Sequence, residues 1–195
     1  MLERRTYLIK ERVAFLKLAD TYDIFDLATG EQVGTAKEEL PGWAKALKLL
    51  VHKRLLPTTV AVYDATDNKL VFKIRRGVPL LRSKVTIHDH DGDLIGYFKS
   101  KLFSLGGGFY VYDRDDQQVA EIKGDWKGWN FKFLTADGAL LGTVTKKWSG
   151  LGKELFTSAD NYVIALEDDV ADRADGNLLL LASGLAIDTI FKEQA

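Results

Sequence analysis

The sequence contains no cysteine, only three histidines and three prolines, and a single methionine among its 195 residues. The absence of cysteine excludes a disulfide scaffold, a thiolate metal site and a cysteine nucleophile. An excess of charge of either sign is also lacking, because 27 basic and 28 acidic side chains leave a net charge of −1. A nearly neutral chain gives no global indication of nucleic-acid binding, so we expect no nucleic-acid partner.

No apolar run in the sequence is long enough to span a bilayer. The N-terminus reads MLERRTY and is not followed by an apolar stretch, so no secretory signal is expected. The longest apolar stretch, residues 178–191, is shorter than the roughly 20 residues of a transmembrane helix and includes Asp188. Because residues 178–187 are apolar around the whole helical circumference, we expect them to form a buried helix. Since neither a secretory signal nor a spanning segment is expected, we predict a cytoplasmic protein.

Turn signals recur every 22–24 residues between β-rich runs in most of the chain. Asp-Asn, Asp-Gly and Asp-Asp pairs adopt positive φ at low cost, which makes them hairpin signals. The pairs are Asp67-Asn68, Asp91-Gly92, Asp115-Asp116, Asp137-Gly138 and Asp160-Asn161, with a looser copy at Thr29-Gly30. The pattern predicts six hairpins, over residues 22–36, 60–74, 85–98, 109–122, 131–145 and 155–166.

Six hairpins supply about twelve strands, and closure into a barrel removes the exposed edges of so large a sheet. A barrel of this size has room for a helix. We therefore predict a mainly β single domain over residues 1–195: a closed twelve-stranded antiparallel barrel of six hairpins around a central C-terminal hydrophobic helix, residues 177–191, capped by Asn177. A basic amphipathic helical insertion at 41–57 is expected to cover one barrel end, with contact to an anionic membrane as the alternative.

The segment 146–166, KKWSGLGKELFTSADNYVIAL, closely resembles the sequence that precedes the C-terminal helix of phospholipid scramblases. Residues 7–13, YLIKERV, resemble the first strand of that family, and the similarity runs in order over most of residues 7–193. The wider group contains the LURP-one-related proteins and the Tubby C-terminal-like domains. The resemblance implies a twelve-stranded barrel around a central helix and a connection with lipid.

The resemblance also implies a candidate calcium site. Scramblases have an acidic segment proposed to bind Ca²⁺, which corresponds here to residues 158–169. At the ligand positions of a twelve-residue calcium loop, Asp160 and Asp169 supply carboxylates and Ser158 a hydroxyl. A hairpin turn at Asp160-Asn161 accounts for the same residues without a metal, so we expect no cofactor, with Ca²⁺ as the alternative.

Tubby-like domains bind phosphoinositide head groups through basic side chains near the barrel wall. No Tubby motif maps onto this sequence residue by residue, and the basic candidates for lipid binding here are Lys99, Lys101, Lys146, Lys147 and Lys153, with a solvated barrel exterior as the alternative. With no Ser-His-Asp order and no paired carboxylates, we expect no catalytic residue and no enzyme. The prediction is a scramblase-related barrel, peripheral at the inner membrane face, that binds anionic phospholipid or phosphoinositide. Two alternatives remain open: a soluble module that binds a protein partner, and a Ca²⁺-dependent phospholipid scramblase.

Overall fold

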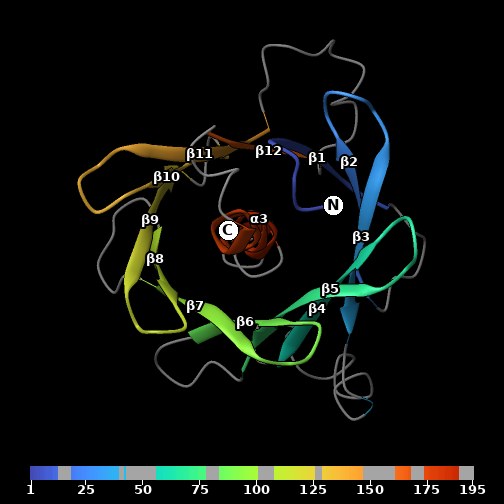
Figure 1. Cartoon of the computed structure of the whole chain (residues 1–195), viewed down its shortest axis with the longest axis horizontal. Coiled ribbons are helices and arrows are strands. Elements are labelled where there is room, and N and C mark those ends of the chain that lie inside the picture. Colours follow the sequence, from blue (N-terminus) through green and yellow to red (C-terminus); the bar gives the residue numbers. More distant parts are fainter. Residues whose placement is uncertain are drawn as a thin grey trace.

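The structure is a computed structural model, and it describes most of the barrel wall and the interior helix. The described residues are 1–12, 19–39, 42, 56–77, 84–100, 108–125, 129–146, 161–167 and 174–188. Twelve strands close into one antiparallel barrel, and helix α3 (Ala174–Ala186) lies inside it (Figure 1). The predicted fold is therefore confirmed. The predicted insertion at 41–57 lies outside the described residues except for Gly42, Leu56 and Pro57.

The strands follow one another around the barrel in sequence order, and β1 pairs with β12 to close it. In strands such as β2, buried inward side chains alternate with less buried outward ones, and the inner faces form one continuous apolar core. The strands are β1 (Thr6–Glu11), β2 (Thr21–Asp26), β3 (Gln32–Glu39), β4 (Thr58–Asp64), β5 (Leu70–Arg76), β6 (Lys84–Asp89), β7 (Leu94–Ser100), β8 (Gly108–Asp113), β9 (Gln118–Asp125), β10 (Asn130–Leu134), β11 (Leu140–Thr145) and β12 (Tyr162–Leu166).

Five of the six predicted hairpins are confirmed, and the sixth is wrong in its pairing. The prediction paired residues 155–157 with the strand that is now β12. In the barrel one edge of β12 pairs with β11 and the other with β1, so neither edge is left for a hairpin partner. The twelfth strand is instead Thr6–Glu11, which comes from the opposite end of the sequence.

The turn residues chosen from the sequence do adopt the left-handed backbone conformation. The residues with φ between +55° and +94° in the five hairpin turns are Gly30, Asn68, Gly92, Asp116 and Gly138. A second side chain, not singled out from the sequence, closes each turn from the end of the first strand. In four turns an Asp carboxylate accepts the N–H two residues later, and in the fifth the Thr135 hydroxyl oxygen accepts the N–H of Ala139.

All five turns lie at one end of the barrel, because they join strands of an up-and-down antiparallel wall. We call this end, which comprises residues 27–31, 65–69, 90–93, 114–117 and 135–139, the hairpin end. The other end, where the odd-numbered strands finish, is the far end. Helix α3 begins near the hairpin end and runs toward the far end.

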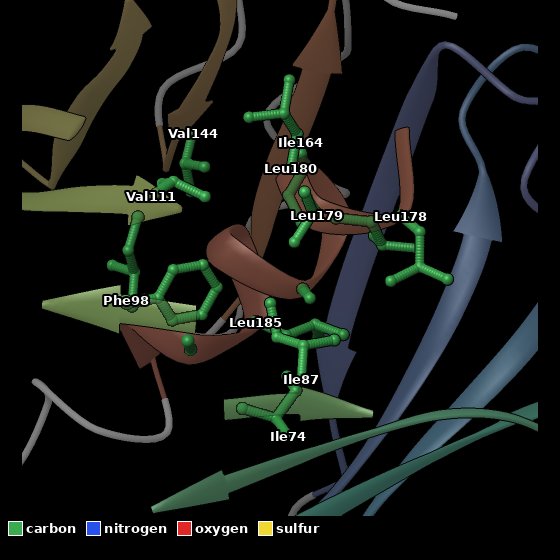
Figure 2. Packing of buried hydrophobic residues seen from close by; sticks show 14 of the residues in the cluster. Ile74, Ile87, Phe98, Val111, Val144, Ile164, Leu178, Leu179, Leu180 and Leu185 are labelled. Carbon is green, nitrogen blue, oxygen red and sulfur yellow. The ribbon is translucent and has the colours of Figure 1, made fainter. Parts of the chain in front are cut away.

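Helix α3 packs against the wall on all sides, as its uniformly apolar sequence predicts. Leu179, Leu180 and Leu185 lie among inward side chains of several strands, including Ile164 and Phe98 (Figure 2). Gly184 allows the closest approach to the wall, because a Cβ there would lie 2.4 Å from the Ile164 Cδ1 atom. Within the described part of the chain, no helix has both the length and the hydropathy needed to cross a membrane.

The predicted capping role of Asn177 is wrong, because α3 begins three residues earlier, at Ala174. Asn177 is fully buried inside the helix, and its Nδ2 donates a hydrogen bond to the Leu2 carbonyl oxygen. The side chain therefore ties the helix to the segment that precedes β1. The predicted helix end at residue 191 lies outside the described residues.

Candidate functional site

Two lysines and two tyrosines gather on the outer wall formed by β6, β7 and β8. Val85 and Ile87 point into the core, so Lys84 on the same strand points outward. Lys84 is the cross-strand partner of Lys99, and Tyr97 is the cross-strand partner of Tyr112. We call Lys84, Tyr97, Lys99 and Tyr112 the Lys–Tyr surface.

Aromatic rings support the two ammonium groups of the Lys–Tyr surface. The Tyr97 and Tyr112 rings are stacked, with centroids 5.0 Å apart and planes inclined by 12°. The Lys84 Nζ lies 3.6 Å from the Tyr97 ring centroid, while the Lys99 Nζ lies 5.1 Å from that centroid and 4.8 Å from that of Tyr112. Like charges on paired residues of adjacent strands repel, and the negative faces of the rings offset part of this repulsion.

A hydrogen bond fixes the ring pair in place. The Tyr97 hydroxyl donates to the Asp116 Oδ1 at 2.6 Å, from the turn between β8 and β9. This hydrogen bond, together with burial, raises the pKa of Tyr97 to about 12, so the hydroxyl stays protonated at neutral pH. The ring is only 2% exposed because its neighbours cover it. The surface therefore presents two cations on a rigid aromatic base.

The predicted lipid-binding lysines are not all brought together. Lys99 belongs to the Lys–Tyr surface, whereas Lys146 follows β11, with β8, β9 and β10 between the two on the wall (Figure 1). The Lys146 Nζ lies 4.4 Å from the ring centroid of Trp129, so it too rests on an aromatic ring. Lys101, Lys147 and Lys153 lie outside the described residues.

Lys84 is the functional candidate that the sequence analysis missed. It precedes Val85 and Ile87, whose inward direction was predictable, so its outward direction followed from the same alternation. Its position opposite Lys99, however, depends on the register between β6 and β7, and a register shift near Ile87 and His88 obscures that register in the sequence.

The hairpin end carries mainly negative charge. Its turns contain two basic residues, Lys69 and Arg114, against a larger number of acidic ones. The acidic residues are Glu31, Asp67, Asp91, Asp93, Asp115, Asp116 and Asp137. An anionic surface would therefore repel the hairpin end and attract the Lys–Tyr surface.

A layer of polar side chains ends the core at the far end. Tyr22 and Tyr162 are buried beside Asp188, which follows α3, and burial and then the charge of Asp188 raise the pKa of both tyrosines. At the far end of β5, Arg76 donates to the Leu56 carbonyl oxygen at 3.3 Å and to the Thr58 hydroxyl at 3.2 Å. The two hydrogen bonds that Arg76 donates offset part of the cost of burying its charge.

Metal binding finds no support in the part of the chain that is described. No three His, Asp or Glu side chains there gather into a group that could hold a metal ion. The predicted calcium positions Ser158, Asp160 and Asp169 lie outside the described residues. The segment 158–169 that contains them includes β12, whose Tyr162 and Ile164 are buried in the barrel wall.

Comparisons with known proteins identify the family of the chain. A sequence model of the scramblase family matches residues 14–194. The chain is also 21% identical over 197 residues to Altered inheritance rate of mitochondria protein 25 of Saccharomyces cerevisiae, covering 86% of this chain and 60% of that protein. The chain thus spans less than two thirds of the length of this relative. No solved structure matches the chain. Since the family match extends over nearly the whole sequence, the chain belongs to the scramblase family.

Proposed function

We propose that this protein is a non-enzymatic, peripheral barrel that binds the anionic inner face of a membrane through the Lys–Tyr surface. One observation carries the proposal: the ammonium groups of Lys84 and Lys99 lie side by side on the stacked rings of Tyr97 and Tyr112. Membership of the scramblase family supports lipid as the partner.

The physical chemistry of the surface suits a phospholipid head-group layer. A basic side chain near an anionic leaflet contributes about 1 kcal/mol of attraction, so the lysine pair contributes about 2 kcal/mol. Tyr112, which is half-buried, adds a ring of the kind favoured at the head-group level, because one end of the ring is apolar and the other is polar, whereas Tyr97 is covered by its neighbours and acts as the support. Repulsion of the acidic hairpin end orients the barrel with that end away from the lipid.

Vesicle co-sedimentation tests the proposal directly. The chain is mixed with phosphatidylcholine vesicles that contain or lack phosphatidylserine, with and without Ca²⁺. We expect binding only to the vesicles with phosphatidylserine, and no requirement for Ca²⁺. The double variant Lys84→Gln/Lys99→Gln should bind roughly 30-fold more weakly, as the loss of about 2 kcal/mol requires.

A matched control removes the same charge elsewhere. Lys69 at the hairpin end and Lys132 on β10 are both exposed and lie outside the Lys–Tyr surface. The variant Lys69→Gln/Lys132→Gln should retain nearly full binding. Equal losses in the two double variants would show that net charge, and not the Lys–Tyr surface, governs attachment. Binding that appears only with Ca²⁺ would favour the calcium-dependent alternative.

A further inference from the structure

A pocket of about 610 Å³ opens at the hairpin end, beside the beginning of α3. Leu178 from the helix and two residues of the wall, Val71 and Ile95, contribute its apolar part. The turn between β4 and β5, together with Asp89, His90 and Arg114, supplies a charged rim. The volume falls within the range of about 300–1,000 Å³ that small-molecule sites occupy.

The apolar floor arises from the hairpin repeat itself. In the β4–β5 hairpin, Val62 pairs with Phe72 and Tyr63 pairs with Leu70, which leaves Val71 as an extra residue in a bulge. Ile95 is the extra residue of the β6–β7 hairpin in the same way. Because a bulge redirects the side chain it carries, these two aliphatic groups lie at the barrel mouth instead of alternating along the strand.

The rim carries both signs of charge, because Lys69 and Arg114 share it with three carboxylates, but it lies among the acidic turns of the hairpin end, whose field favours a cation. Asp64, Asp67 and Asp89 line the pocket. Asp67 already pairs with the Lys69 ammonium at 2.8 Å, and Asp64 accepts the Thr66 N–H and lies 3.4 Å from the amino group of Met1. These contacts occupy two of the three carboxylates.

Asp89 is differently placed. Its Oδ1 accepts two hydrogen bonds within the turn, from the N–H groups of Asp91 and Asp93. These hydrogen bonds lower the pKa of Asp89, so the carboxylate is ionised at neutral pH. Asp89 lines the pocket, and the neighbouring acidic turns add a field of the same sign.

We propose that this pocket binds a small cationic amphiphile, an amine or quaternary ammonium compound with a short apolar tail. The tail contacts Val71, Ile95 and Leu178, and the cationic group pairs with the Asp89 carboxylate. This site goes beyond the proposed membrane contact, because it lies at the hairpin end, whereas Lys84 and Lys99 pair at the other end of β6 and β7.

Calorimetric titration with three probes of equal tail length tests both the site and the charge preference. Octylamine, octanol and octanoate are each titrated, at neutral pH and below their aggregation concentrations, into the intact chain. We expect octylamine to bind at least tenfold more tightly than octanol, and octanoate to bind least. Comparable affinity for octanoate, or no binding of octylamine, would overturn the proposal.

Two variants locate the binding. Val71→Trp fills the pocket and should weaken octylamine binding at least tenfold, whereas Val119→Trp changes the corresponding bulge residue of the β8–β9 hairpin, outside the pocket, and should not. Asp89→Asn keeps the Oδ1 acceptor and should remove the preference for octylamine over octanol. Unchanged octylamine binding in Val71→Trp, or an unchanged preference in Asp89→Asn, would refute the assignment. Neither variant alters Lys84 or Lys99, so vesicle binding should persist.

Discussion

Replacing Leu181 by Ala should cost the protein about 3 kcal/mol of unfolding free energy. Leu181 lies in the middle of α3, is 0% exposed and belongs to the core that lines the inside of the barrel. Truncation of a fully buried Leu to Ala costs 2–5 kcal/mol, because transfer free energy is lost and a cavity remains. The wall can relax little around the cavity, because every strand is hydrogen-bonded on both edges.

Urea unfolding followed by tryptophan fluorescence measures this cost as a free energy of unfolding, and thermal unfolding measures it as a change in melting temperature. In a domain of this size, 1 kcal/mol corresponds to about 2–4 °C in the melting temperature, so Leu181→Ala should melt about 6–12 °C lower. Leu140→Ala is the control, because Leu140 is 40% exposed at the hairpin end, and it should change stability by less than about 1 kcal/mol. Equal, small effects in the two variants would refute the interior position of α3.

Three further substitutions test separate parts of the barrel. Gly124→Ala should destabilise by about 1–3 kcal/mol in chemical unfolding, because its Cβ would lie 1.9 Å from the buried Phe131 ring. Asn177→Ala should lower the melting temperature through loss of about 1–3 kcal/mol, since it leaves the Leu2 carbonyl oxygen without this donor. Asp89 has a folded-state pKa below its ordinary value of 3.8, so its charge stabilises the fold above that pH. The stability deficit of Asp89→Asn should therefore be largest near neutral pH and shrink as the pH falls through the folded pKa; a deficit that grows in acid would contradict this sign.

Local chemistry made the turns predictable, and long-range pairing made the closure of the barrel harder to predict. Asn68 and Gly92 adopt positive φ because asparagine tolerates the left-handed conformation and glycine has no Cβ to oppose it, and this preference can be recognised from a few residues. The pairing of β1 with β12 joins the two ends of the chain, and no local pattern specifies it. The sequence therefore predicted the number of strands but assigned the wrong partner to β12.

The Lys–Tyr surface was likewise predictable from local sequence only in part. The outward direction of Lys99 follows from strand alternation, but its proximity to Lys84 depends on register, and the supporting stack of Tyr97 on Tyr112 depends on two registers. The role of Asn177 was mistaken because capping residues and buried polar residues look alike in a sequence. The start of α3 at Ala174 and the contact with the Leu2 carbonyl oxygen distinguish them.

Native-state hydrogen exchange of the α3 amides, with and without vesicles containing phosphatidylserine, tests the enclosure of the helix most directly. A helix surrounded by strands opens only when the barrel opens. The amides of residues 178–186 should therefore exchange with the free energy of global unfolding, and at the same rate when vesicles are bound. Fast exchange in solution that becomes protected only on vesicles would show that the helix lies outside the barrel and meets the lipid itself.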